Sequence, residues 1–286
     1  MDTEAASVGK LYICATPIGN LGDMSPRAVE TLRTVDIIAA EDTRNSIRLL
    51  NHFDIHTPMT SYHEYNRFEK ADELVARMLK GENVAIITDA GTPCISDPGE
   101  VLVQKCAEAG IPVTSLPGPS ALITALTLSG FSVRRFVFEG FLPRGARKER
   151  TAVLERLRDE TGTIVLYEAP HHLKETLEEL TGVLGSSRRI ALCRELTKLH
   201  EEVIRTTLGE AALLEPRGEY VLVIEGRDPE ESRKEAAAKY EEMSLEEHMR
   251  LYTDRGIDRK EAMKAVAKDR GISRRDVYNA LLVTER

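Results

Sequence analysis

The sequence predicts an α/β protein made of two α/β domains followed by a small helical module. Strand-like and helix-like segments alternate from residue 10 to residue 226, which is the pattern of an α/β fold. From about residue 244 the pattern becomes purely helical, and the 286 residues are enough for two compact domains and an appendage. We therefore expect domains over residues 1–119 and 120–227, a charged linker or helix over residues 228–243, and a helical tail over residues 244–286.

Short apolar runs rich in branched residues predict the strands of the first domain, and amphipathic stretches between them predict its helices. Ser25 and Pro26 pair a capping hydroxyl with a proline at the first helical position. Gly81 suits the end of a later helix. The expected strands are residues 11–15, 36–40, 83–87 and 111–116, and the expected helices are residues 26–35, 68–80 and 99–109.

The second domain is expected to begin with an apolar helix over residues 120–129. Five strand candidates follow, at residues 136–138, 163–167, 189–193, 203–207 and 220–224. The last four are expected to form a mixed sheet with antiparallel pairs, because short turns replace the crossover helices that parallel pairs need.

The tail resembles a helix-turn-helix over residues 262–282. Gly271 suits the turn, Ser273 caps the next helix, and Val277, Ala280 and Leu281 face inward. Two interpretations of this tail stay open. The helices can pack on their own protein or a dimer mate, or they can contact nucleic acid through Arg270, Arg274 and Arg275 at the start of the second helix.

The distribution of charge matters more than the net charge of −8. Residues 134–158 hold eight Arg or Lys against three Glu, and residues 255–286 hold nine basic against five acidic residues. Phosphate affinity depends on such local patches. The acidic total therefore does not exclude a nucleic-acid partner.

Several classes of protein are disfavoured by what the sequence lacks. No apolar stretch approaches the roughly 18–20 residues that span a bilayer, so no membrane partner is expected. The four cysteines are scattered without a Cys-x-x-Cys, which argues against zinc and disulfides and for a cytoplasmic protein. Neither Gly-x-Gly-x-x-Gly after a strand nor Gly-Lys-Ser/Thr occurs, which argues against dinucleotide enzymes and nucleoside triphosphatases.

Three loops rich in Gly and Pro follow expected strands, at residues 16–23, 88–99 and 117–121. In open α/β sheets, ligands bind at the carboxyl ends of the strands. None of the three loops contains Lys or Arg. Such loops suit a ligand without phosphates, held through backbone amides and carbonyls.

Together with four further motifs, these loops resemble the tetrapyrrole-methylase-like superfamily of S-adenosylmethionine-dependent methyltransferases. More narrowly, they are similar to its small-subunit ribosomal RNA 2'-O-ribose (cytidine) methyltransferases, which modify the decoding region. The further motifs are residues 40–44, 166–171, 193–202 and 218–220, and the resemblance runs from about Gly9 to Gly226. One departure is that Gly145 and Ala146 interrupt the basic run that commonly follows the family's Phe-Leu-Pro-Arg motif, which leaves the individual RNA contacts open.

The resemblance implies S-adenosylmethionine as cofactor, bound in the cleft between the two α/β domains, and no metal. It also implies a cytidine of 16S rRNA in the small ribosomal subunit as substrate, and a homodimer. The residues that it places at the cofactor are Pro17, Ala90, Gly91, Thr92, Ile95, Ser96, Ser120, Ala121, Tyr167, Glu168 and Tyr220.

Methyl transfer from a sulfonium is a direct displacement, so the protein must mainly align the reactants. A ribose hydroxyl is a poor acid, and a general base would help. The candidates are Asp23, Glu41, Asp42, His63, Glu64 and Glu168. The stretch 61–66, dense in polar and aromatic groups, can instead position RNA or cap the next helix.

The expected RNA contacts are Arg44, Arg144, Arg147, Lys148, Arg150, Arg274 and Arg275. Each of these residues also has a structural role as an alternative to RNA contact. Arg44 can pair with Glu41 or Asp42, and residues 144–150 can be the exposed start of a helix. Two other functions stay open: a tetrapyrrole-precursor methyltransferase on the same scaffold, and a DNA-binding regulator that senses a small molecule.

Overall fold

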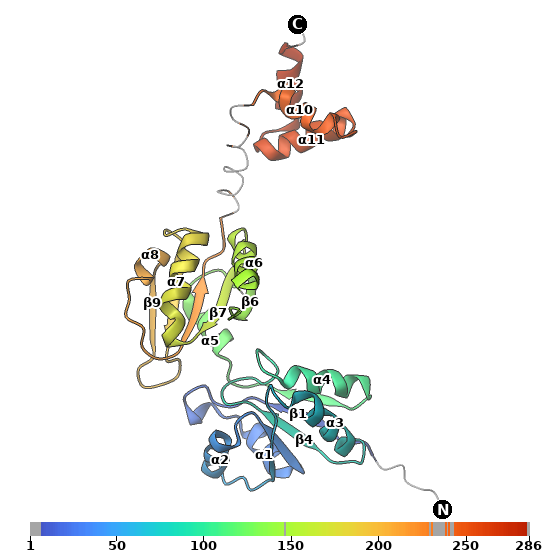
Figure 1. Cartoon of the computed structure of the whole chain (residues 1–286), viewed down its shortest axis with the longest axis vertical. Helices are drawn as coiled ribbons and strands as arrows, with labels where there is room; N and C mark the ends of the chain where they lie inside the picture. The colour runs from blue at the N-terminus through green and yellow to red at the C-terminus, as the bar shows by residue number, and fades with distance from the viewer. Residues whose placement is uncertain are drawn as a thin grey trace, which may run out of the picture.

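The computed structural model describes residues 7–145, 147–228, 230, 238, 240 and 243–284, with side chains up to residue 281. Two five-stranded sheets with their helices, followed by a cluster of three helices, make up these residues (Figure 1). The expected α/β class with a helical tail is confirmed. The charged linker expected over residues 228–243 lies mostly outside the described residues.

The first sheet is entirely parallel, with the strand order β3-β2-β4-β1-β5. The four expected strands are present, and a short fifth strand, β3, joins them at one edge. The strands are β1 (Leu11–Cys14), β2 (Ile37–Ala40), β3 (Met59–Ser61), β4 (Val84–Ile87) and β5 (Val113–Leu116). Because all five run in the same direction, the loops after β1, β4 and β5 open at the same edge.

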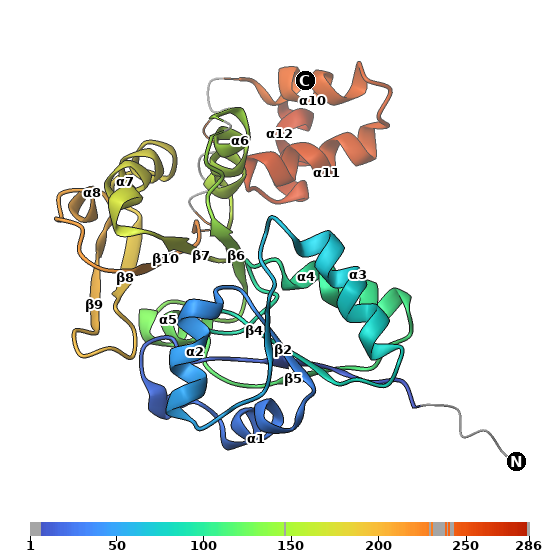
Figure 2. The same cartoon turned by 60° about the horizontal axis from the view of Figure 1, so that its bottom comes forward.

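Helices cover both faces of the first sheet (Figure 2). They are α1 (Pro26–Thr34), α2 (Thr43–His52), α3 (Arg67–Met78) and α4 (Gly99–Glu108), whereas the short helix η1 (Leu21–Asp23) is exposed in the loop after β1. On one face, Leu74 of α3 and Leu102 of α4 are fully buried against the sheet, and on the other Leu32 of α1 and Leu50 of α2 are. The cap expected at Ser25 is present, since its Oγ accepts a hydrogen bond from Ala28 N at 3.1 Å.

The second sheet has the order β6-β7-β10-β8-β9. Its strands are β6 (Phe136–Phe141), β7 (Thr163–Glu168), β8 (Arg189–Arg194), β9 (Glu202–Thr207) and β10 (Tyr220–Ile224). The expected antiparallel pairs join β7, β10, β8 and β9, and β6 adds a parallel pair with β7.

The two faces of this sheet have different neighbours. Helix α5 (Ala121–Ser129) packs on the face that carries Val165, Ala191 and Val221. The helices α6 (Arg147–Arg158), α7 (Pro170–Leu184) and α8 (Leu208–Ala211) cover the opposite face. Because side chains alternate along a strand, Tyr167 lies on the α5 side, whereas Glu168 and Tyr220 lie on the α7 side.

The tail consists of α10 (Leu245–Thr253), α11 (Arg259–Arg270) and α12 (Arg274–Thr284). The expected two helices are there, with Gly271 between them at φ +63° and Val277 fully buried. The sequence did not predict α10. Its Met249 packs with Val266 and Leu281 in a small core shared by the three helices. Within the described residues, no helix is both long and apolar enough to cross a membrane.

Candidate functional site

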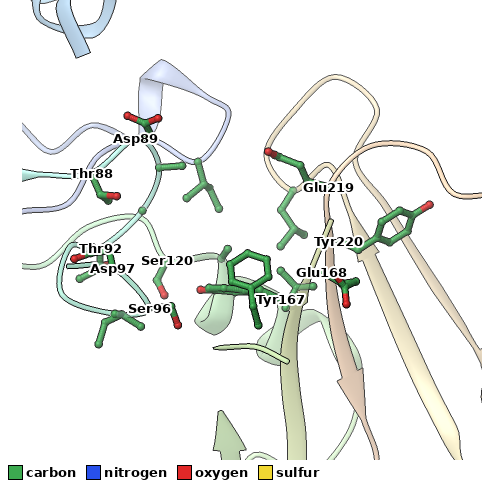
Figure 3. A pocket seen from close by; sticks show the side chains of 18 of the residues that line it. Thr88, Asp89, Thr92, Ser96, Asp97, Ser120, Tyr167, Glu168, Glu219 and Tyr220 are labelled. Atoms are coloured by element: carbon green, nitrogen blue, oxygen red, sulfur yellow. The ribbon is translucent and has the colours of Figure 1, made fainter. Parts of the chain in front are cut away.

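A cavity of about 340 Å³ lies between the two sheets, a size within the usual range of small-molecule sites. Figure 3 shows Thr88, Asp89, Thr92 and Ser96 on one side and Tyr167, Glu168 and Glu219 on the other. The first group follows β4, and the second comes from the ends of β7 and β10. Both α/β units therefore supply walls to one cavity.

The loops after β1 and β4 are joined to each other at the cavity. Thr16 N donates to Gly91 O at 2.9 Å, Gly91 N donates to Thr16 O at 3.0 Å, and Thr16 Oγ1 donates to Thr88 O at 3.0 Å. Gly91 has φ +86°, a conformation that glycine adopts at little cost. The backbone around Gly91 is thus fixed before any ligand binds.

The rest of the β4 loop is strained and held by one carboxylate. Cys94 and Ser96 have φ +70° and +59°, a backbone region that residues other than glycine rarely adopt. Asp97 accepts hydrogen bonds from Cys94 N and Gly99 N, both at 2.7 Å, and burial raises its pKa. Burial raises the pKa of Cys94 to about 12, so its sulfur stays a thiol near neutral pH.

Aromatic side chains form the wall contributed by the second unit. The Tyr167 ring makes edge contacts with Phe138 and Phe141, with centroids 4.9 and 5.6 Å apart. Its Oη accepts a hydrogen bond from Leu122 N at 3.2 Å, and burial raises its pKa. Tyr167 is therefore a neutral, fixed surface that links α5 to the cavity.

The turn between β8 and β9 places the cationic side chain of Lys198 at the cavity. Lys198 Nζ lies 2.6 Å from Glu219 Oε2 and 3.2 Å from Glu195 Oε1. Burial alone would lower the pKa of Lys198, but these hydrogen bonds outweigh it and raise the pKa. A hydrogen bond from Glu219 N, chiefly, lowers the pKa of Glu195, so Lys198 and Glu195 are both charged near neutral pH.

Negative charge predominates around the cavity. The lining of the cavity contains one cationic residue, Lys198, and six carboxylate residues: Glu41, Asp89, Asp97, Glu168, Glu195 and Glu219. Such a lining favours a cationic ligand and disfavours one with several phosphates.

Of the eleven residues expected to contact the cofactor, ten line this cavity. The exception is Pro17, whose neighbour Ile18 lines the cavity instead. Two of the ten direct their side chains elsewhere. Tyr220 is 6% exposed, its Oη accepts from Arg217 N at 3.2 Å, and its ring points away from the cavity (Figure 3). The carboxylate of Glu168 accepts from Arg144 Nη2, Ala169 N and Thr176 Oγ1 at 3.0, 2.9 and 2.6 Å.

The candidate bases are not gathered at one point. Glu64 pairs with Arg67 at 2.5 Å, Asp23 is exposed at the end of η1, and His63 is half-buried with Nδ1 unpartnered among the described residues. These three are absent from the lining of the cavity. Glu41 lines it and accepts from Thr88 Oγ1 at 2.6 Å, whereas Asp42 caps α2.

The expected RNA contacts differ in how free their side chains are. Arg44, 88% exposed, forms an ion pair with Asp42 at 2.7 Å. Asp42 is one of the two carboxylates expected as an alternative to an RNA contact. Arg150 is only 15% exposed and pairs with Glu179 at 2.6 Å. Arg147, Lys148, Arg274 and Arg275 are exposed. In the tail, Arg270 is bound to His248 Nδ1 and to two carbonyls.

No group of three or more His, Cys, Asp or Glu side chains that could hold a metal ion occurs in the described part of the chain. The carboxylates at the cavity are instead engaged by backbone or side-chain amides, hydroxyls, Arg144 or Lys198.

Comparison with known proteins agrees with this architecture. The model of the family described as Tetrapyrrole (Corrin/Porphyrin) Methylases matches residues 10–212. The chain belongs to this family. A Synechocystis protein named ribosomal RNA small subunit methyltransferase I is 48% identical over 282 residues, 97% of this chain and 99% of the relative. One of Bacillus subtilis with the same name is 44% identical, covering 96% of this chain and 94% of the relative.

Several solved structures share the fold at low sequence identity. Diphthine synthase aligns with a TM-score of 0.63 at 14% identity, covering 76% of this chain and 90% of that one. Uroporphyrin-III-C-methyltransferase from Thermus thermophilus gives 0.54 at 17% identity, covering 76% and 94%. At these identities the likeness concerns the fold alone.

Sequence reasoning missed Phe141, Lys198 and Glu219 as parts of the cavity. Lys198 and Glu219 lie within two motifs that carry the family resemblance, so a signal was present without a role attached to it. Phe141 begins the Phe-Leu-Pro-Arg motif of the resemblance, so its signal likewise came without a role at the cavity.

Proposed function

We propose that this chain is an S-adenosylmethionine-dependent methyltransferase that acts on the 16S rRNA of the small ribosomal subunit. The proposed acceptor is the ribose 2'-hydroxyl of a cytidine in the decoding region. The observation that carries the proposal is near full-length similarity to proteins named ribosomal RNA small subunit methyltransferase I. We further propose that the enzyme is cytoplasmic and homodimeric.

The lining of the cavity suits the proposed cofactor in charge and in polarity. S-adenosylmethionine carries a sulfonium, an ammonium and one carboxylate, and the excess of carboxylates around the cavity favours its net positive charge. Ile18, Ile95 and Leu196 offer apolar surface for the adenine. The backbone of residues 90–92 and 120–121 would hold the polar groups. When bound, the cofactor supplies an electrophilic methyl group.

The protein's own contribution is alignment and the exclusion of water. Positioning of two reactants can lower a barrier by about 7–11 kcal/mol, and the preformed bridge between Thr16 and Gly91 supports such positioning. Direct displacement needs no Lewis acid, so we propose that no metal takes part. Exposed Arg147 and Lys148, with Arg274 and Arg275 on the tail, are the proposed phosphate contacts.

Transfer of tritiated methyl groups tests the proposal. The full chain is incubated with labelled S-adenosylmethionine and with undermethylated small ribosomal subunits, a porphyrinogen or DNA. Label should appear in the subunits alone, and mass mapping should locate it on the ribose of one cytidine. Label in the porphyrinogen would instead support a tetrapyrrole-precursor enzyme, and cofactor binding with sequence-specific DNA affinity would support a regulator.

A chelator that spares magnesium, such as 1,10-phenanthroline, tests the metal-free reaction without unfolding the subunits. Activity should be unchanged. Activity that is lost and then restored by a transition metal would contradict the proposal.

A further inference from the structure

A second, shallower hollow adjoins the cofactor cavity. Its lining comprises Phe141, Leu142, Arg144 and Ala169. Phe141 and Ala169 also line the cavity, so the two spaces share part of their walls. The hollow combines an aromatic ring with a guanidinium group beside the place where methyl transfer is proposed.

The backbone of β6 is shaped so that Phe141 faces this hollow. The pairing of β6 with β7 shifts register between Phe138 and Gly140, and Gly140 has φ +63°. Such a bulge re-aims the side chains that follow it. As a result Phe138 and Phe141 both contact the Tyr167 ring, at 4.9 and 5.6 Å. Gly140 also allows close approach, because a Cβ there would lie 2.5 Å from Ser96 Oγ.

The Phe141 ring is held by its neighbours and still remains half-exposed. Its edge contact with Tyr167 holds the ring, yet the residue is 50% exposed. A large apolar side chain left open beside a binding cavity offers a surface for stacking.

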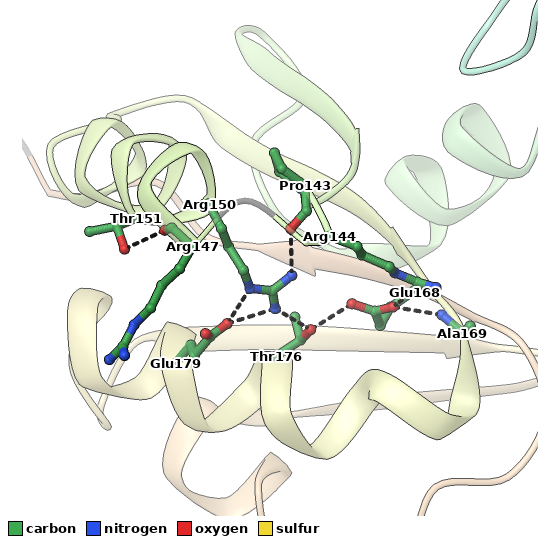
Figure 4. A network of polar contacts seen from close by, with 9 residues as sticks. All are labelled: Pro143, Arg144, Arg147, Arg150, Thr151, Glu168, Ala169, Thr176 and Glu179. Carbon is green, nitrogen blue, oxygen red and sulfur yellow. Dashed lines mark hydrogen bonds and ion pairs between the residues drawn. The ribbon is translucent and has the colours of Figure 1, made fainter.

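Arg144 lies over the same ring, and its guanidinium is held by the polar network drawn in Figure 4. Its Cζ lies 5.8 Å from the Phe141 centroid, and its Nη2 donates to Glu168 Oε1 at 3.0 Å. The side chain of Glu168 is 2% exposed and also accepts from Thr176 Oγ1 at 2.6 Å.

The network continues through Thr176 to the contact between α6 and α7. Arg150 Nη2 donates to Thr176 Oγ1 at 2.9 Å, and Arg150 Nε donates to Glu179 Oε2 at 2.6 Å. The guanidinium of Arg144, on a side chain 46% exposed, is thus anchored on one side and open on the other.

We propose that Phe141 and Arg144 form a stacking site for an unpaired nucleobase of the RNA strand that carries the acceptor ribose. The base lies on the Phe141 ring, and Arg144 donates hydrogen bonds to its acceptor edge. Single-stranded RNA is commonly held in this way, by aromatic rings and Arg planes. This inference rests on the proposed function. It assigns Glu168 to the positioning of Arg144 rather than to proton transfer.

The stacking is measured with the full chain and a short single-stranded RNA carrying the fluorescent analogue pyrrolocytidine. Phe141→Leu keeps an apolar side chain but removes the ring, and Phe141→Tyr keeps the ring. Phe136→Leu is the matched control, since Phe136 begins the same strand and is 40% exposed. Loss of one stacked base should weaken RNA affinity about five- to hundredfold, and Phe141→Tyr and Phe136→Leu should not.

Calorimetry with S-adenosylmethionine separates the stacking site from the cofactor cavity, which Phe141 also lines. Phe141→Leu should raise the KM for small subunits far more than it changes cofactor affinity. Glu168→Gln should weaken RNA binding in the same direction, through Arg144. A variant that loses cofactor affinity while its RNA affinity and analogue quenching stay unchanged would assign the ring to the cofactor and overturn the inference.

Failure of the proposed function would look different. A wild-type chain that neither quenches the analogue nor methylates subunits overturns that function and this inference with it. A wild-type chain that methylates subunits, beside a Phe141→Leu variant with unchanged KM and quenching, overturns only the stacking site.

Discussion

Thr16 and Gly91 exchange two backbone hydrogen bonds, 2.9 and 3.0 Å long, and so tie the loop after β1 to the loop after β4. The two strands are neighbours in the parallel sheet, which brings both loops to one edge. Gly91 must hold φ +86° to make this bridge, and a Cβ there would lie 3.4 Å from Ile18 Cγ2.

Gly91→Ala should therefore weaken S-adenosylmethionine binding by more than it weakens the fold. The left-handed conformation costs an alanine about 1–2 kcal/mol. Gly110→Ala is the matched control, because Gly110 has φ +68° with nothing within 4 Å of a Cβ. Denaturant unfolding should show similar decreases in stability in both variants, whereas calorimetry should show weaker cofactor binding only in Gly91→Ala. Equal cofactor affinities would place the ligand away from this bridge.

Exposed charge on α6 should govern the salt dependence of RNA binding. Reversing Arg147 and Lys148 to Glu should lower the slope of log affinity against log salt by about 0.7–0.9 for each RNA phosphate that the variant no longer neutralises. Cofactor affinity should not change. Arg158→Glu, at the exposed far end of the same helix, serves as control. An unchanged slope in the double variant would show that this end of α6 is only a solvated helix start.

The position of Arg150 could not be predicted from the charge pattern of residues 144–150. The charge pattern placed Arg144, Arg147, Lys148 and Arg150 together, but it could not show that α7 packs beside α6. That packing leaves Arg150 15% exposed against Glu179. Arg150→Glu should therefore lower stability, because two carboxylates would then face each other in a half-buried site.

The elements that sequence reasoning found are those with a strong local pattern. Strands β1, β2 and β4 are short runs of apolar residues, nearly all of them buried. Strand β3 was missed because its three residues are only half-buried, which leaves no apolar pattern to detect. The loops at the cavity were found because parallel strands bring their carboxyl ends to one edge. Lys198 and Glu219 were missed because their proximity to those loops depends on how the two sheets meet.

The tail should lose stability in mild acid through His248. This side chain is fully buried, its Nδ1 accepts from Arg270 Nε at 3.1 Å, and its Nε2 lies 3.2 Å from Asp269. An Nδ1 that accepts a hydrogen bond requires the neutral ring. Burial, chiefly, lowers the pKa of His248, against the opposing effect of Asp269.

Because the folded pKa is below the unfolded value near 6.5, the stabilisation is complete above pH 6.5 and is lost as the pH falls below it. Hydrogen exchange over residues 245–281, corrected for intrinsic rates, should speed up between pH 7.5 and 5.5. His248→Gln should abolish that difference while lowering protection at both values. Exchange that is independent of pH in the wild type would contradict this assignment.

Deletion of residues 244–286 should preserve cofactor binding and reduce methylation of assembled small subunits. The cavity is lined by residues 18–221, and the tail has a core of its own. Folded and protein-bound RNA offers a large anionic surface on which exposed Arg274 and Arg275 can dock.

The charge variant Arg274→Ala/Arg275→Ala separates docking from assembly. It leaves Arg270 in place, which joins α11 to the start of α10 through Ser244 O. If the tail docks on RNA, this variant should reproduce most of the deletion's loss of activity and flatten its salt dependence, with an unchanged sedimentation coefficient. If instead the deletion alone lowers activity and converts a dimer to a monomer in analytical ultracentrifugation, the tail is an assembly element. The resemblance to a helix-turn-helix would then reflect only how three short helices bury a small apolar core.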